Sequence, residues 1–196
     1  MYPSVLLIDN HDSFTRNLAQ LLDESGLCSY KVCFPEELTM PEVYRFDKIL
    51  ISPGPGVPSE YPSVTGIIQD AGKDKSILGI CLGFQAIVEV FGGSLFNLPE
   101  VVHGIRRVIQ IREPVDTLFR GIPSRFKAGL YHSWAARKDC LPSCLKITAE
   151  STDGIIMGVA HEQLAIRGVQ FHPESYMTEY GKELISNWLR DQQETC

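Results

Sequence analysis

Residues 76–85 read Ser-Ile-Leu-Gly-Ile-Cys-Leu-Gly-Phe-Gln, and this segment is the strongest indication of the fold in the sequence. Its first five residues form a short apolar run, which is typical of a strand buried on both faces of a sheet. A glycine-flanked turn follows, and residues 85–91 then show a helical pattern. The segment therefore predicts a strand that turns sharply into a helix, with Cys81 at the turn.

The same alternation of strand and helix runs through the first half of the chain. Strands are expected at residues 5–9, 30–34, 48–52 and 76–80. Helices are expected from a cap at Ser13 to a stop at Gly26, near residues 41–44, at 63–71 and at 85–91. This order predicts an α/β fold whose core is flavodoxin-like, an open, mostly parallel sheet flanked by helices.

The second half is richer in strands. Short strands are expected at residues 101–111, 126–131, 145–149, 155–160 and 164–170, followed by a helix at 179–191. We expect these strands either to extend the sheet or to form a small antiparallel layer beside it. Because the sequence has no repeat, low-complexity segment or linker, residues 1–196 are expected to form a single domain.

Composition and charge exclude several classes of protein. The net charge of -6 argues against binding to nucleic acid, and no apolar run approaches the roughly 18 residues of a membrane span. The N-terminus lacks the pattern of a signal peptide, so we expect a cytoplasmic protein. Six cysteines without zinc-site spacing are then expected to be reduced thiols rather than disulfides or metal ligands.

Cys81 stands between Gly79 and Gly83, at the junction of the expected strand and helix. Glycines remove side chains that would clash in a sharp turn, and a helix N-terminus favours a thiolate. The turn therefore predicts an exposed nucleophile, with the Leu82 backbone N–H placed to bind an oxyanion. A buried structural cysteine is the alternative that this pentapeptide leaves open.

His172 and Glu174 flank Pro173 directly after the last expected strand. A cysteine nucleophile needs a base that keeps it a thiolate and later protonates the leaving amine. The imidazole in turn needs an orienting carboxylate. Because proline restricts the backbone between them, the two side chains are expected to keep a set relation. The alternative for a His-x-Glu taken by itself is a surface position without function.

Residues 53–56, Pro-Gly-Pro-Gly, form a loop after the expected third strand. Glycine allows backbone amides to approach a ligand, and proline stiffens the loop. We expect the Gly54 N–H to be a second oxyanion donor, with an ordinary surface turn as the alternative. Since the carboxyl ends of parallel strands meet at one edge of a sheet, this loop, residues 9–10 and Cys81 are expected to converge.

Six ordered blocks of sequence together resemble the class I glutamine amidotransferases, and within them the small subunits of anthranilate synthase and aminodeoxychorismate synthase. The blocks span nearly the whole chain: residues 7–10 with 12–15 (Leu-Ile-Asp-Asn and Asp-Ser-Phe-Thr), 52–56 (Ser-Pro-Gly-Pro-Gly), 79–83 with 85–87 (Gly-Ile-Cys-Leu-Gly and Gln-Ala-Ile), 102–104 (Val-His-Gly), 131–133 (Tyr-His-Ser) and 168–175 (Gly-Val-Gln-Phe-His-Pro-Glu-Ser).

The resemblance implies hydrolysis of L-glutamine to glutamate and ammonia by a triad of Cys81, His172 and Glu174. Implied contacts to glutamine are the backbone of Gly54, Pro55 and Gly56, the side chain of Gln85, and the backbone of Ser133 and Trp134. No metal or organic cofactor is implied. The implied partner is a large chorismate-binding synthase subunit, that of anthranilate synthase in tryptophan biosynthesis, with aminodeoxychorismate synthase in p-aminobenzoate and folate biosynthesis as the alternative.

Three positions depart from the family pattern. Phe84 replaces the usual His and removes a polar group beside the nucleophile, though not a member of the triad. Ile105 replaces a Lys, and Leu130 replaces an Arg. These last two lie in segments expected near the synthase partner or the ammonia exit, with residues 101–107 and the surroundings of Tyr131 as the expected contact.

Three other functions stay open on the sequence alone. A cysteine peptidase or related hydrolase fits the nucleophile turn, although Gln85 and the loop at residues 53–56 favour glutamine. A partner-binding subunit with impaired glutaminase fits the departures at Phe84 and Ile105. A phosphate- or nucleotide-binding domain is the weakest alternative, because no glycine-rich phosphate loop follows the first strand.

Overall fold

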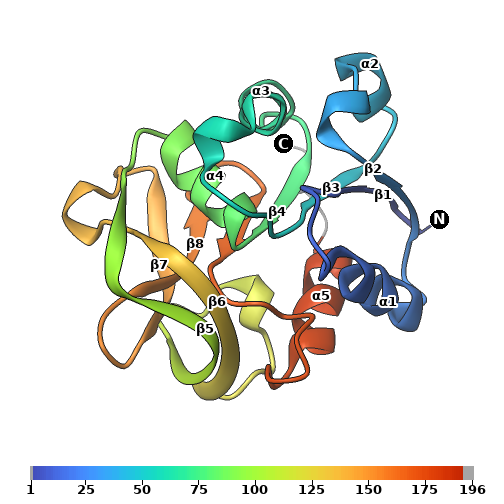
Figure 1. Ribbon diagram of the computed structural model, residues 1–196. Helices are drawn as coiled ribbons and strands as arrows, with labels where there is room; N and C mark the ends of the chain where they lie inside the picture. The colour runs from blue at the N-terminus through green and yellow to red at the C-terminus, as the bar shows by residue number, and fades with distance from the viewer. Residues whose placement is uncertain (1, 192–196) are drawn as a thin grey trace.

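A computed structural model describes residues 2–191 of the chain, apart from the side chains of residues 100 and 101, and places the strands in one mixed sheet (Figure 1). The strands are β1 (Ser4–Ile8), β2 (Ser29–Cys33), β3 (Lys48–Ile51), β4 (Ser76–Ile80), β5 (Leu95–Ile111), β6 (Arg125–Ala136), β7 (Leu145–Ser151), β8 (Ile156–His161) and β9 (Ile166–Val169). Their spatial order is β2-β1-β3-β4-β9-β8-β7-β5-β6.

The sheet has a parallel half and an antiparallel half. Strands β2, β1, β3, β4 and β9 pair in parallel, whereas β8, β7, β5 and β6 continue from β9 in antiparallel pairs. The α/β fold with an antiparallel second half is therefore confirmed. Of the two arrangements expected for the later strands, the structure has the first, in which they extend the same sheet.

Helices cover both faces of the parallel half. They are α1 (Thr15–Ser25), α2 (Met40–Val43), α3 (Pro62–Ala71), α4 (Leu82–Val90) and α5 (Gly181–Arg190), with short 3-10 turns at Pro35–Glu37, Pro58–Glu60, Thr117–Phe119 and Lys138–Cys140. Figure 1 shows α1 and α5 below the sheet and α3 and α4 above it. Because successive strand residues point to opposite faces, each face of the parallel strands needs such a cover.

The core follows this alternation. In β1, Val5 and Leu7 pack with α1 and α5, whereas Leu6 and Ile8 pack with α3 and α4. All four side chains are fully buried. The continuous apolar runs noted in the sequence are therefore strands with a hydrophobic layer on each side, which is the usual environment of parallel strands.

Lys48 fixes the closing helix to the amino end of the sheet. Its Nζ donates to the carbonyl oxygen of Trp188, in the last turn of α5, at 3.0 Å, and to that of Asp191, directly after the helix, at 2.7 Å. Burial lowers the pKa of Lys48 to about 8, with Asp191 opposing that shift. A cation at this position binds the carbonyl groups that a helix C-terminus leaves without partners.

Element boundaries differ from the sequence expectations in places. Ser13 does not cap α1: the carboxylate of Asp12 accepts a hydrogen bond from the Phe14 N–H instead, and Thr15 begins the helix. The helix after Cys81 begins at Leu82 rather than at Gln85. Gly26 ends α1 in the left-handed conformation, as expected. None of the helices in the described residues has the length and apolar character that crossing a membrane requires.

Candidate active site

The register of the parallel strands brings four chain segments to one edge of the sheet. Ile8 pairs with Ile51, Ile51 pairs with Gly79, and Ile80 pairs with Val169. The residues that follow these pairs are therefore neighbours: residues 9–10, the loop after residue 51, Cys81, and residues 170–175. The expected convergence of three segments at the carboxyl edge is confirmed, and the last strand brings His172 and Glu174 to the same edge.

Cys81 occupies a strained turn. Its φ is 51° and its ψ is -98°, a backbone conformation that residues other than glycine rarely adopt. Its N–H donates to the Val169 carbonyl at 2.8 Å, and α4 begins at the next residue. The Leu82 N–H is thus among those at the start of a helix that have no partner within the helix.

Glycine is required at position 79 for this turn to form. A Cβ on Gly79 would lie 2.4 Å from the backbone carbonyl carbon and oxygen of Gly83. Side-chain carbons essentially never approach backbone atoms so closely, so a larger residue would push α4 away from the strand. The glycine pattern that predicted a sharp turn therefore has its reason in the close packing of α4 on β4.

His172 and Glu174 form a buried ion pair. His172 Nδ1 and Glu174 Oε1 are 2.7 Å apart, and their side chains are 3% and 0% exposed. Burial disfavours the imidazolium, but Glu174 and then Cys81 outweigh that cost and hold the pKa of His172 well above its ordinary value of 6.5. The pair is therefore suited to holding His172 as a protonated imidazole.

Aromatic rings enclose the imidazole. The Tyr131 ring lies 4.8 Å from His172 and the Phe14 ring 5.2 Å from it, both measured between ring centroids. The Tyr131 hydroxyl and the Ser175 Oγ are 3.0 Å apart. These contacts restrict the position of the imidazole and keep water from its faces.

The loop at residues 53–56 is fixed from both sides. Asn10 Nδ2 donates to the Ser52 carbonyl at 2.8 Å, and the Tyr61 hydroxyl donates to the Pro55 carbonyl at 3.0 Å. A Cβ on Gly54 would lie 2.6 Å from the Leu82 Cδ2 atom, so the Gly54 backbone packs directly beside the start of α4. The two backbone segments that were expected to supply oxyanion donors are therefore neighbours.

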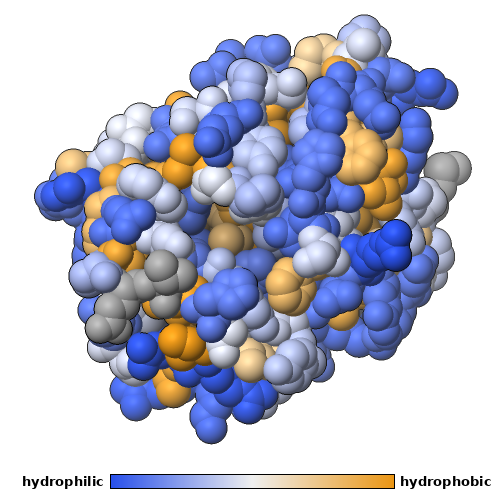
Figure 2. Space-filling model, in the orientation of Figure 1, coloured by the Kyte–Doolittle hydropathy of each residue, from blue (hydrophilic) through white to orange (hydrophobic). Residues whose placement is uncertain are grey.

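A cleft of about 370 Å³ opens at this edge of the sheet. It is lined by Gly54, Pro55, Gly56, Cys81, Gln85, Tyr131, His132, Ser133 and Trp134. All the residues to which glutamine contacts were assigned by resemblance lie in this lining. Figure 2 shows the corresponding face as mostly hydrophilic, with apolar side chains scattered over it and a hollow near the centre of the view.

His132 and Gln170 belong to the site although no role was assigned to them from the sequence. The pKa of His132 is lowered to about 4 by burial, and its Nδ1 lies 2.9 Å from the Trp134 carbonyl. A neutral imidazole that donates from Nδ1 leaves Nε2 as an acceptor, and this buried atom has no hydrogen-bond partner. Gln170 is fully buried and its Nε2 lies 3.5 Å from the Cys81 sulfur. His132 lies within β6 and Gln170 directly follows β9. Both are polar residues in the blocks that carry the family resemblance, and this is the signal that could have identified them.

None of the three residues that depart from the family pattern lines the cleft. Phe84 is fully buried in the apolar layer between α3, α4 and the sheet, and it is not among the residues that line the cleft beside Cys81. Leu130 is also buried, in the opposite layer, so its own side chain is not part of a partner surface; the expectation that its segment lies near the partner or the ammonia exit stays a prediction. Ile105 is 38% exposed, as a contact residue needs to be.

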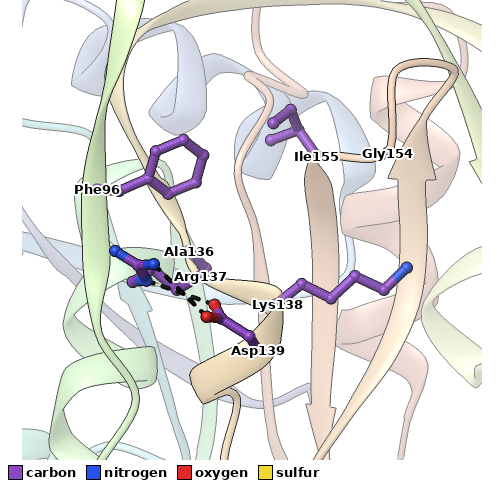
Figure 3. Close-up of a pocket in the computed structure, with 7 residues that line it drawn as sticks. All are labelled: Phe96, Ala136, Arg137, Lys138, Asp139, Gly154 and Ile155. Atoms are coloured by element: carbon purple, nitrogen blue, oxygen red, sulfur yellow. Dashed lines mark hydrogen bonds and ion pairs between the residues drawn. The ribbon is translucent and has the colours of Figure 1, made fainter.

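A second cavity, of about 270 Å³, lies at the far end of β6, and Figure 3 shows its lining. Arg137 and Asp139 form an ion pair with one another there, and Lys138 Nζ lies 2.6 Å from the buried Glu150 carboxylate. Because these charges are already paired within the protein, the cavity presents no excess charge to a ligand.

The cysteines and possible metal ligands in residues 2–191 are dispersed. Cys28, Cys33, Cys81, Cys140 and Cys144 all have free thiols, and Cys196 lies outside the described residues. In the same part of the chain no three His, Cys, Asp or Glu side chains group as a metal site would require.

The chain is similar in sequence to glutamine amidotransferases over nearly its whole length. The model of the family described as glutamine amidotransferase class-I matches residues 6–192. The chain is 41% identical to the aminodeoxychorismate/anthranilate synthase component 2 of Bacillus subtilis, over 94% of this chain and 95% of that protein. It is 39% identical to the anthranilate synthase component 2 of Cyanophora paradoxa, over 94% and 97% of the two chains.

A solved structure shares the fold. A Thermoplasma acidophilum protein described as one subunit of a GMP synthase superposes with a TM-score of 0.86 at 25% sequence identity. The match covers 96% of this chain and 93% of that one.

Substitution of Glu174 tests the charge state of the buried pair. Because the pKa of His172 is raised on folding, the imidazolium stabilises the fold at and below pH 6.5, and this stabilisation is lost as the pH rises through the folded-state pKa. Glu174→Gln removes the charge that raises the pKa. We therefore expect its free energy of unfolding to decline less than that of the wild type as the pH rises above about 6.5.

Urea unfolding at a series of pH values measures this difference. Glu183→Gln, an exposed position on α5, is the matched control and should follow the wild type. Identical pH dependence of the wild type and Glu174→Gln would contradict a charged His172 in the folded protein.

Proposed function

Because the chain belongs to the class I glutamine amidotransferase family, we propose that it hydrolyses L-glutamine to glutamate and ammonia through Cys81, His172 and Glu174. The observation that carries this proposal is the buried His172–Glu174 pair, 2.7 Å apart, at the sheet edge where Cys81 occupies its strained turn. A nucleophile, a base and an orienting acid at one site are the requirements of nucleophilic acyl transfer.

The first half of the reaction forms a thioester. The Cys81 thiolate attacks the side-chain carboxamide carbon of glutamine, and the carbonyl oxygen becomes an oxyanion. The backbone N–H groups of Leu82 and Gly54 bind this oxygen, and one such donor is typically worth about 3 kcal/mol in the transition state. The carbon–nitrogen bond then breaks as the His172 imidazolium protonates the departing ammonia.

The second half releases glutamate. Neutral His172 takes a proton from a water molecule, which attacks the glutamyl thioester; the carbon–sulfur bond breaks and the thiolate is restored. Glu174 holds the imidazole through Nδ1 in both halves, so that Nε2 serves the reacting groups. No metal or organic cofactor takes part in this scheme, since the thiolate and the imidazole supply the chemistry.

Glutamine binds in the cleft beside Cys81. We assign its contacts to the backbone of Gly54, Pro55, Gly56, Ser133 and Trp134 and to the side chain of Gln85, all of which line the cleft. Backbone amides and carbonyls suit the carboxylate and ammonium groups of an α-amino acid, because they offer both donors and acceptors in fixed positions. The whole chain, residues 1–196, is proposed to act as one amidotransferase domain in the cytoplasm.

The proposed recipient of the ammonia is a chorismate-binding synthase subunit, by analogy with the relatives that carry anthranilate synthase names. Anthranilate synthesis is the first choice. The name of the Bacillus subtilis relative includes aminodeoxychorismate synthase as well, which supports that synthase as the second candidate. Co-purification of the synthase from the native cell identifies which of the two it is.

The proposed contact surface includes the exposed part of β5 that begins at His103. Ile105, Arg106 and Arg107 are exposed there, and Arg106 Nε donates to the Met177 carbonyl at 2.8 Å. This bond ties the strand to the segment just after Glu174, and Tyr176 in that segment is 85% exposed. A positive surface on a chain of net charge -6 favours an acidic partner surface.

Replacement of the nucleophile tests the proposed chemistry. We expect Cys81→Ser to lower glutamate release by about three orders of magnitude or more, because a hydroxyl is rarely ionised at neutral pH. Cys140→Ser, at an exposed free thiol, is the matched control and should keep full activity. A glutamine-like chloroketone should label Cys81, and glutamine should protect it. Full activity of Cys81→Ser would overturn the proposed function.

Charge reversal tests the proposed contact surface. The double variant Ile105→Asp with Arg106→Glu should weaken co-purification of the synthase by at least about tenfold, because rim charges and a buried apolar contact both change. Arg45→Glu, an exposed cation next to α2, is the control and should leave the complex intact. A complex of unchanged stability in the double variant would remove the assignment.

A further inference from the structure

Gln170 lies beside Cys81 in the site, and the proposed reaction gives its side chain no role. We propose that its side chain is a positioning residue for Cys81: its Nε2–H donates to the sulfur and stabilises the thiolate in the orientation needed for attack. This inference rests on the proposed role of Cys81 as nucleophile and adds the group that holds the nucleophile ready.

The strand register places Gln170 beside Cys81. Ile80 pairs with Val169, so the next residues on the two strands are Cys81 and Gln170. The Cys81 N–H donates to the Val169 carbonyl at 2.8 Å, and the Gln170 N–H donates to the Met157 carbonyl at 3.0 Å. These backbone hydrogen bonds alone hold Cys81 and Gln170 next to each other.

The contact between the side chains is a hydrogen bond to sulfur. Gln170 Nε2 lies 3.5 Å from the Cys81 Sγ atom, and Gln170 is fully buried. Sulfur is a large atom, so its hydrogen bonds are longer than those to oxygen. A thiol is a weak acceptor, whereas a thiolate carries a full charge and accepts strongly. The bond therefore favours the reactive state over the resting one.

A chain of hydrogen bonds decides which end of the Gln170 carboxamide faces the sulfur. The Trp134 carbonyl can accept but not donate, so it takes an N–H from Gln85 Nε2, at 3.0 Å. The same nitrogen lies 3.2 Å from Gln170 Oε1 and donates its second hydrogen there. With its oxygen occupied by Gln85, Gln170 turns its nitrogen toward Cys81.

This chain links the nucleophile to the wall of the substrate cleft. Trp134 and Gln85 both line the cleft, and the chain uses the nitrogen of Gln85 but not its carbonyl oxygen. A ligand can therefore bind the Gln85 oxygen while Gln85 still orients Gln170. His172 and Gln170 then act on the sulfur in different ways, the first through its charge and the second through a neutral N–H.

A simple space-filling role for Gln170 makes a different prediction. A residue that only packs could be replaced by Met, of similar length and volume, with no change in the ionisation of Cys81. A donor to the thiolate could not, because Met has no N–H. The pH dependence of thiol reactivity thus separates the two roles, whereas loss of activity would not.

The test measures alkylation of Cys81 by iodoacetamide, without glutamine, across a range of pH, with mass spectrometry of the Cys81 peptide. For Gln170→Met we expect the midpoint of the rate profile to move to higher pH by about one to two units, as the loss of a hydrogen bond to a charged group implies. Gln163→Met, at an exposed glutamine in the β8–β9 turn, is the matched control and should leave the midpoint unchanged.

A second variant guards against failure of Gln170→Met to fold. Gln85→Met removes the donor that orients Gln170, so its midpoint should shift in the same direction by a smaller amount. In the double variant the shift should be no larger than that of Gln170→Met. An unchanged midpoint in folded Gln170→Met, or in Gln85→Met, would overturn the inference.

Glutamate release by the wild type and Gln170→Met completes the test. With the thiolate less available, kcat should fall by about tenfold or more at neutral pH while KM changes little. If the wild type hydrolyses glutamine and the midpoint does not move, the inference fails and the proposed function stands. If the wild type hydrolyses no glutamine, the proposed function fails, and the alkylation profile still reports on the bond to sulfur.

Discussion

The parallel pairing of β4 with β9 is the constraint from which the geometry of the site follows. In this pairing Ile80 lies opposite Val169, so the next residues on the two strands, Cys81 and Gln170, are neighbours although they are 89 residues apart in sequence. His172 and Glu174 follow Gln170 by two and four residues at the same edge of the sheet. A slip in this register would move the proposed base and its orienting acid away from the sulfur and would turn buried side chains to the wrong face. The apolar layers on both sides of the sheet therefore fix the geometry of the chemistry as well as the fold.

The strain at Cys81 is maintained by that packing. A non-glycine residue at a φ of 51° and a ψ of -98° costs on the order of 1–3 kcal/mol, and it persists when its surroundings allow no other path. Gly79 lets the start of α4 come so near to β4 that the chain must turn at the cysteine. The result is an orientation in which the sulfur lines the cleft and the first N–H groups of the helix lie beside it. The strained backbone of Cys81 thus depends on the packing of α4 against β4. A looser core or a larger residue at position 79 would let the turn relax.

Much of this could be predicted from the sequence, because the signals are local. Apolar runs locate β1, β3 and β4; polar residues follow β1, and glycine-containing turns follow β3 and β4. The residues directly after these three strands locate the site. Tertiary contacts decided the rest. Serine is a common helix N-cap, yet at the start of α1 the Asp12 carboxylate, and not Ser13, accepts the hydrogen bond from the Phe14 N–H. Phe84 lies close to the nucleophile in sequence, yet the helix directs it into the core. The antiparallel strands could be recognised but not placed, because their pairing depends on partners far along the chain. The orientation of Gln170 depends on Gln85 and Trp134, so no local pattern reveals it.

The proposed reaction requires that Cys81 form a covalent glutamyl thioester at this sheet edge. Mass spectrometry of protein quenched in acid during glutamine turnover, with the synthase present, detects such an intermediate. We predict a glutamyl adduct on the Cys81 peptide that disappears once glutamine is exhausted and is absent from Cys81→Ser. Steady release of glutamate with an adduct on another residue, or with undiminished turnover in Cys81→Ser, would contradict the assignment of Cys81 as the nucleophile.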